Sequence, residues 1–223
     1  MATAVHATIW DDAGLGAPSV VLVHGTMTWG TDSFGFAAQR PLADRFHLVV
    51  MDRRGFGASP DITRSDYAVD AQDVVALLGT GAHLVGHSYG VVVAMLAAAI
   101  RPQAVRSLAL IEPAAHRMAA DHPIVATALR RMREGLAAAP PDVSAADWLR
   151  LSTESVGLSP LDPTPDRLRA ARSASREQPC WEADFPLESL SAASWPKLIV
   201  TGTWETAPSA YRAVGAKACL GRP

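Results

Sequence analysis

Residues 86–90 read Gly-His-Ser-Tyr-Gly and lie between two apolar runs. Residues 82–85, Ala-His-Leu-Val, are typical of a short buried strand, and the ten apolar residues 91–100 are typical of a buried helix. The pentapeptide is therefore predicted to be a sharp strand-to-helix turn with Ser88 at its tip. Such a turn brings the two chain segments close together, which explains a glycine on either side of the central three residues. We expect the Ser88 hydroxyl to stand clear of the sheet.

Length and composition suit one folded domain with room for an insertion. The chain has 223 residues, of which 49% are hydrophobic and 19% charged, so it can bury one sizeable core. The net charge is −2, and Lys and Arg do not cluster on any predicted element, so neither nucleic acid nor an anionic membrane is an expected partner. The expected partner is a small molecule. The first ten residues lack a signal-peptide pattern and no apolar run could cross a bilayer, so we expect a cytoplasmic protein.

The sequence gives no indication of a cofactor or a metal site. Cys180 and Cys219 match no metal or redox spacing, so we expect free thiols, with a disulfide as the alternative. Gly55 and Gly57 lack the third glycine of a dinucleotide-binding signature and open no helix. We therefore expect neither cofactor nor metal.

Further apolar runs are spaced like the strands of an α/β sheet. They occupy residues 20–23, 47–51, 105–111 and 197–201, with residues 6–10 as a plausible first strand. Helices are predicted between them, at about residues 36–46 and 67–78, and again at 208–220. Strands that alternate with helices at this spacing predict a mostly parallel sheet flanked by helices. The loops that leave the carboxyl ends of such strands are where ligand sites lie.

Residues 114–193 break this alternation. They show no clear strand, and helical stretches such as 124–138 and 168–177 alternate with proline-containing breaks. We interpret residues 114–193 as a helical cap, inserted into a core that residues 1–113 and 194–223 form.

The motifs together resemble the α/β-hydrolase superfamily. His24-Gly25, then residues 52–59 (Asp-Arg-Arg-Gly-Phe-Gly-Ala-Ser), then residues 86–90 stand in that family's order and spacing. The resemblance implies an α/β-hydrolase fold and hydrolysis of carboxylic esters through a serine acyl-enzyme. It also implies that Ser88 is the nucleophile and that the backbone N–H groups of Thr26 and Tyr89 form the oxyanion hole.

The resemblance leaves the catalytic acid and the base open. Glu205 follows Gly202 where most members carry an aspartate, and Glu112 ends the run 105–111 where some members place the acid; Glu205 is slightly favoured. The family's histidine comes later in the chain than the acid, but no histidine follows Glu205. The usual last strand, histidine loop and closing helix are thus expected to be missing. His116 and His122 are the candidates for a replacement base.

Three further expectations follow. The apolar residues of the cap, among them Trp148 and Trp181, indicate esters with small to medium acyl groups. A sheet ending at residues 197–201 would leave backbone groups unpaired, so the chain should either form a homodimer through that edge or be marginally stable. The activity should be reduced without the usual histidine. The alternative is a hydrolase-like ligand-binding protein or an inactive truncated fragment.

Overall fold

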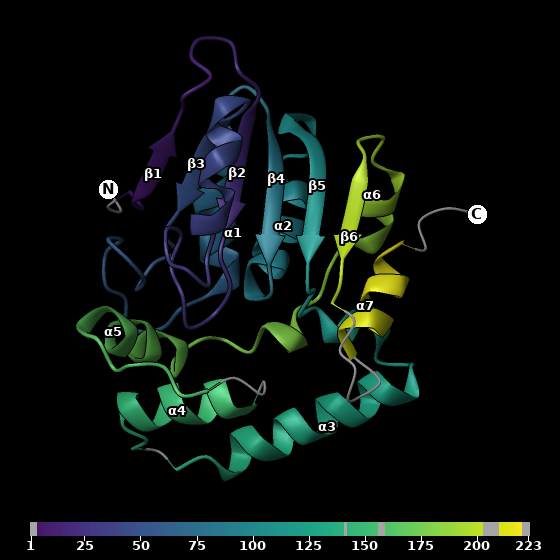
Figure 1. The fold of residues 1–223 in the computed structure, drawn as a ribbon. Coiled ribbons are helices and arrows are strands. Elements are labelled where there is room, and N and C mark those ends of the chain that lie inside the picture. The colour runs from purple at the N-terminus through teal and green to yellow at the C-terminus, as the bar shows by residue number, and fades with distance from the viewer. Residues whose placement is uncertain (1–3, 141, 156–158, 203–209, 220–223) are drawn as a thin grey trace.

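The computed structural model describes residues 4–140, 142–155, 159–202 and 210–219. These residues form a six-stranded sheet in the order β1-β3-β2-β4-β5-β6 (Figure 1). The strands are β1 (Ala7–Trp10), β2 (Ser19–Val23), β3 (His47–Met51), β4 (Ala82–His87), β5 (Val105–Ile111) and β6 (Lys197–Val200). Neighbouring strands are parallel except β1, which pairs antiparallel with β3. The predicted mostly parallel α/β sheet is confirmed.

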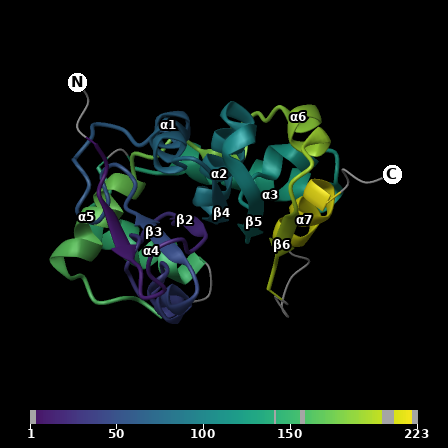
Figure 2. The same cartoon turned by 90° about the horizontal axis from the view of Figure 1, so that it is seen from above.

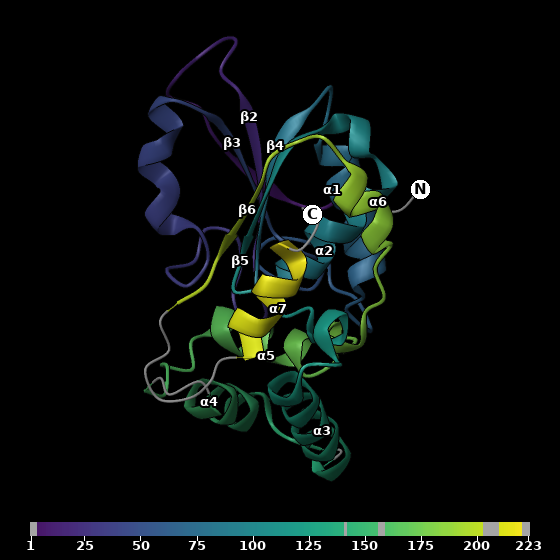
Figure 3. The same ribbon diagram turned by 90° about the vertical axis from the view of Figure 1, so that its right-hand side faces the viewer.

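Helices cover both faces of this sheet. On one face lie α1 (Tyr67–Leu77), α2 (Tyr89–Ile100) and α6 (Leu187–Ala192), and on the other lies η1 (Ala37–Asp44), drawn in dark blue (Figures 2 and 3). Nine of the twelve residues of α2 are buried, because this helix lies between the sheet and α1. That burial explains why the sequence of α2 is apolar on every side. Within the described residues, no helix is both long and apolar enough to span a bilayer.

We call residues 114–193 the helical segment. It contains η3 (His116–Ala119), α3 (Pro123–Ala138), α4 (Ala145–Ser155), α5 (Pro165–Ala174), η4 (Cys180–Glu182) and α6. Helices α3, α4 and α5 form a layer at the carboxyl ends of the strands (Figure 1). The helix predicted at 168–177 starts earlier, at Pro165, because the Thr164 side chain accepts a hydrogen bond from the Arg167 N–H and caps the first turn. Cys180 is buried and is a free thiol, as predicted.

Strand β6 lies at the edge of the sheet. Among the described residues it pairs with β5 alone. Its Ile199 faces α7 (Ala210–Cys219), since a Cβ added to Gly215 would lie 3.1 Å from Ile199 Cγ2. Leu198 and Val200 alternate with Ile199 and are 59% and 43% exposed. The strand thus carries exposed apolar side chains on the face opposite α7.

Candidate active site

Ser88 occupies a strained turn between β4 and α2. Its backbone has φ 53° and ψ −115°, a conformation that a residue with a side chain rarely adopts. A Cβ added to Gly86 would lie 2.4 Å from the carbonyl oxygen of Gly90, and one added to Gly90 would lie 2.1 Å from the carbonyl oxygen of Val23. Both glycines are therefore required by close backbone approach. The predicted strand-to-helix turn is confirmed.

Ser88 lines a cavity of about 500 Å³ between the sheet and the helical segment. Thr26, Tyr89, Glu112 and His116 line the same cavity, so the fold brings together most of the residues that the sequence singled out. The helical segment contributes mainly apolar side chains to the opposite wall: Met132, Leu136, Trp148, Leu161, Ala174 and Trp181. The same segment also contributes polar residues to the lining, among them Ser152, Arg167 and Gln178.

Backbone strain is concentrated around this cavity. Within the described part of the chain, three residues other than glycine have positive φ: Met27 (62°), Ser88 (53°) and Glu112 (49°). All three line the cavity. Strained conformations persist only where the surrounding structure enforces them, and they cluster at functional sites. This clustering marks the cavity as the candidate active site.

The loop after β2 lies directly against the turn that holds Ser88. A Cβ added to Gly25 would lie 3.0 Å from the Cβ of Ser88, closer than such carbons normally approach, so a glycine favours this close contact. The neighbouring His24 is buried and bridges two backbone groups. Its Nδ1 lies 2.7 Å from the Gly25 carbonyl oxygen, and its Nε2 accepts a hydrogen bond of 2.9 Å from the Arg53 N–H. Burial, with the positive charge of Arg53, holds the pKa of His24 well below its usual value, so the ring is neutral and Nδ1 carries the proton.

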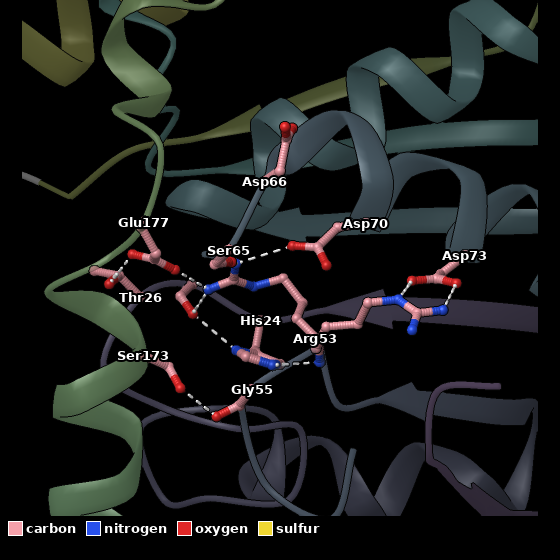
Figure 4. A network of polar contacts seen from close by, with 12 residues as sticks. His24, Thr26, Arg53, Gly55, Ser65, Asp66, Asp70, Asp73, Ser173 and Glu177 are labelled. Carbon is pink, nitrogen blue, oxygen red and sulfur yellow. Dashed lines mark hydrogen bonds and ion pairs between the residues drawn. The ribbon is translucent and has the colours of Figure 1, made fainter. Parts of the chain in front are cut away.

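A buried arginine lies at the centre of a network of charges behind this loop (Figure 4). The Arg53 side chain is fully buried, and its Nη1 donates to Asp70 Oδ2 at 3.1 Å. Its Nη2 donates to Glu177 Oε1 at 2.5 Å and to the Gly25 carbonyl oxygen at 3.0 Å. Burial disfavours the charge of Arg53, but the carboxylates of Glu177 and Asp70 outweigh burial and raise its pKa.

Burial acts on the two acids of this network in the opposite sense. It raises the pKa of Asp70 to about 6, although the charge of Arg53 opposes the shift. Burial likewise raises the pKa of Glu177. Glu177 also accepts a hydrogen bond from the hydroxyl of Thr26. Glu177 thus links the helical segment to the loop after β2, and Arg167 of α5 provides a second link, because its guanidinium pairs with Asp32 of the same loop at 2.6 Å.

No sequence motif assigns a catalytic role to Arg53, Asp70 or Glu177. Arg53 stands in the quoted stretch 52–59, immediately beyond the buried strand β3, and that position was the one available signal. Glu177 lies 124 residues away from Arg53 in the chain, and no local pattern links the two. Their pairing depends on how the helical segment docks on the sheet.

Of the two candidate acids, Glu112 lies within the described residues and Glu205 does not. Glu112 follows β5, donates its backbone N–H to the Val200 carbonyl oxygen at 2.9 Å, and accepts the N–H of Gly202 on its carboxylate. It therefore joins the ends of β5 and β6 beside the cavity. Glu205 lies outside the described residues.

The two candidate histidines also differ in burial and in their position relative to the cavity. His116 is 3% exposed and lines the cavity, with its Nδ1 at 3.0 Å from the Ala114 carbonyl oxygen. Burial lowers the pKa of His116, which favours the neutral ring. His122 is exposed at the start of α3 and does not line the cavity. Within the described residues, no group of three or more His, Cys, Asp or Glu side chains could hold a metal ion.

Comparison with known proteins identifies the family. Residues 20–220 match the profile of the alpha/beta hydrolase family. The chain belongs to that family. Among curated relatives, this α/β-hydrolase is 39% identical over 95 residues to the pimeloyl-[acyl-carrier protein] methyl ester esterase of Chromobacterium violaceum. That match covers 42% of this chain and 36% of the esterase, so the chain matches the curated relative over about a third of that protein's length.

Solved structures agree with the fold. An α/β hydrolase from Sphaerobacter thermophilus superposes with a TM-score of 0.64 at 22% identity, over 98% of this chain and 85% of that one. The enol-lactonase from Burkholderia xenovorans superposes with a TM-score of 0.60 at 20% identity, over 97% and 85% of the two chains. At these identities the likeness shows the α/β-hydrolase fold.

Proposed function

We propose that this α/β-hydrolase cleaves carboxylic esters through an acyl-enzyme on Ser88. The observation that carries the proposal is the strained Ser88 turn, at the start of α2 and on the wall of the cavity. A serine held in this way presents its hydroxyl to a bound ligand. The relative named a methyl ester esterase supports the same chemistry.

Each half of the reaction, acylation and deacylation, requires two proton transfers and one stabilised oxyanion. Ser88 Oγ attacks the ester carbonyl carbon, its proton passes to a base, and the carbonyl oxygen becomes an oxyanion. When the C–O bond breaks, the alcohol leaves with a proton and the acyl group stays on Ser88. Water then attacks the acyl-enzyme, and the acid leaves as the proton returns to Oγ.

The N–H groups of Tyr89 and Thr26 are the proposed donors to the oxyanion. Tyr89 is the first residue of α2, where backbone N–H groups have no partner within the helix and favour negative charge. Thr26 lines the cavity from the loop that touches the Ser88 turn. Donors fixed before the reaction stabilise the oxyanion without a cost of reorganisation.

For proton transfer we propose His116 as the base, with Glu112 or Glu205 as the acid. His116 is the candidate histidine that lines the cavity, and the proton on Nδ1 leaves Nε2 as the basic atom of a neutral ring. Among the described residues, no histidine is hydrogen-bonded to the Ser88 hydroxyl. We therefore expect slow turnover, since a base must come within hydrogen-bonding reach of the proton it removes.

The cavity supports esters of small to medium acyl groups. Its volume of about 500 Å³ lies in the lower half of the usual range for ligand pockets, roughly 300–1,000 Å³. Its apolar wall comes from the helical segment, which we propose acts as a cap over Ser88. Apolar acyl chains would bury against Trp148 and Trp181.

A series of 4-nitrophenyl esters of rising chain length tests this function. We expect turnover to peak at short to medium chains and to disappear in Ser88→Ala. Best turnover of the longest chains would refute the substrate class. Saturable binding without hydrolysis, unchanged in Ser88→Ala, would instead favour a ligand-binding protein.

A further inference from the structure

Two side chains hold the carbonyl oxygen of the peptide group between Gly25 and Thr26. Its carbonyl oxygen accepts hydrogen bonds from Arg53 Nη2 at 3.0 Å and from the protonated Nδ1 of His24 at 2.7 Å. The peptide is trans and planar, so its N–H, which belongs to Thr26, points in the opposite direction to that carbonyl. Whatever fixes the carbonyl therefore also fixes the direction of the Thr26 N–H.

The same guanidinium contacts the second proposed donor residue. Arg53 lies 4.1 Å above the ring of Tyr89, whose side chain is 2% exposed. Such a contact between a cation and an aromatic face is strongest where water is excluded. The buried Arg53 side chain thus contacts both the Gly25 carbonyl oxygen, which fixes the direction of the Thr26 N–H, and the ring of Tyr89. Arg53 itself does not line the cavity, so it cannot act on a substrate directly.

Glu177 connects this arrangement to the helical segment. One carboxylate oxygen accepts from Arg53 Nη2 and the other accepts from the Thr26 hydroxyl (Figure 4). The next residue, Gln178, donates its N–H to the Ser65 carbonyl oxygen at 2.8 Å, which holds the chain in place there. The Glu177 side chain is only 9% exposed and Arg53 is fully buried, so water competes little for their contact, whereas the contact with the exposed Thr26 is open to solvent.

We propose that Glu177 and Arg53 are positioning residues for the oxyanion hole, and that docking of the helical segment through Glu177 completes that hole. The inference rests on the proposed function, because it takes Thr26 and Tyr89 as the donors. With Glu177 docked, the loop after β2 is fixed through both its carbonyl and its hydroxyl. Without it, Arg53 keeps Asp70 and the Gly25 carbonyl, but Thr26 loses its link to the helical segment.

Glu177→Gln is the most informative change. An amide has the shape of the carboxylate, but it offers one acceptor oxygen where two donors now point. If the amide oxygen accepts from Arg53, the amide NH2 can only donate to the Thr26 hydroxyl, so that hydrogen bond reverses, and Arg53 loses the negative charge of its partner. Thr26→Val removes only the hydroxyl contact and keeps the backbone N–H. It provides a milder variant should Glu177→Gln fail to fold.

The test compares two ligands of the full chain. An aryl trifluoromethyl ketone forms a bond from its carbonyl carbon to Ser88 Oγ; the proton of Oγ leaves to solvent and the carbonyl oxygen becomes an alkoxide in the oxyanion hole. The matching methyl ketone fills the cavity without this step. In Glu177→Gln we expect the affinity for the trifluoromethyl ketone, followed by ¹⁹F NMR, to fall about 10- to 100-fold, somewhat less than the loss of a whole oxyanion donor. The affinity for the methyl ketone should stay within about twofold, since no oxyanion forms.

Two matched variants separate this effect from general loosening of the helical segment. Glu182→Gln removes another glutamate of the segment, paired with Arg133 at 2.5 Å and remote from Thr26. Arg169→Gln removes contacts from α5 to Asp61 and to the Gly57 and Ser59 carbonyl oxygens. Both should leave the ratio of the two affinities unchanged.

The outcomes distinguish the two proposals. If the wild-type chain forms an adduct that Ser88→Ala abolishes, and Glu177→Gln and Thr26→Val bind both ketones as the wild type does, the positioning role is refuted and the proposed function stands. Equal losses for both ketones would also refute it, because they would indicate only a disturbed cavity. If the wild-type chain forms no Ser88 adduct, the proposed function fails, and the positioning role fails with it.

Discussion

The two sides of the Ser88 cavity are built differently. On the side of β2 and β3, the loop that carries Thr26 is held by Arg53, His24 and Glu177, all largely or fully buried. On the side of β5 and β6, Glu112 closes the strand ends next to an edge strand whose Leu198 and Val200 are exposed. The first side suits charge stabilisation, and the second suits proton transfer. The difference suits an account in which the proposed oxyanion hole is held more firmly than the proposed proton relay.

The largest expected effect concerns the proposed catalytic acid, on the side of the cavity formed by β5 and β6. We expect Glu205→Gln to lower ester hydrolysis more than Glu112→Gln, on the order of 10³ to 10⁴ in rate if a triad acid is lost. Steady-state kinetics with one activated ester would compare the two variants. The reverse order would assign the acid to the end of β5.

The next largest effect is expected from a substitution that disturbs packing at the Ser88 turn. In Gly90→Ala the new methyl group would lie 2.1 Å from the Val23 carbonyl oxygen, so the turn or β2 must move. We expect a loss of about 3 kcal/mol in unfolding free energy, measured by urea denaturation.

The matched control for this change is Gly135→Ala in α3, where a new Cβ would meet nothing within 4 Å. Removing a glycine from a helix interior should stabilise by about 0.5–1 kcal/mol. Similar effects of the two substitutions would contradict the account of the turn.

The pH dependence of stability tests the buried network on the first side. Because burial raises the pKa of Asp70 from 3.8 to about 6, the folded chain holds this proton more tightly than the unfolded chain does. The contribution of Asp70 to stability is therefore fully present below about pH 4 and is lost as the pH rises through about 6.

Asp70→Asn removes this titration. The stability of the wild type minus that of the variant should fall between pH 4 and pH 7, by on the order of 2 kcal/mol. Urea unfolding at several pH values would measure the difference. A difference that rises with pH would show that the pairing with Arg53 outweighs burial.

The smallest effect is expected at the sheet edge, where we propose that two chains pair through β6. Leu198→Lys should shift the chain towards monomer by a few-fold in dissociation constant, because a charge on an edge strand opposes pairing. Sedimentation velocity would follow the change. Leu15→Lys, at an exposed leucine in the turn between β1 and β2, is the control and should have no effect. A wild-type chain that is monomeric at all concentrations would contradict the dimer.

Sequence patterns predicted the central sheet well and the charge network not at all. The run 47–51 coincides with β3, where the last four residues are buried, because burial on both faces makes such a strand a continuous apolar run. The predicted turn also places Ser88 correctly. The helix predicted at 36–46 is instead a 3₁₀ helix, Ala37–Asp44, with Pro41 inside it. Arg53 and Glu177 meet only in the tertiary structure, so periodicity could not reveal their pairing.

The rapid-mixing reaction of the purified chain with 4-nitrophenyl butyrate tests the central claim most directly. Nitrophenolate leaves without a proton and is a better leaving group than the Ser88 alkoxide, so acylation should be faster than deacylation, although a base must take the Ser88 proton in the first step and activate water in the second. We predict a burst approaching one nitrophenolate per chain followed by a slow steady state, with the burst absent in Ser88→Ala and the steady state slower in His116→Ala. Fast steady-state turnover without a burst, or a burst that survives in Ser88→Ala, would contradict the account.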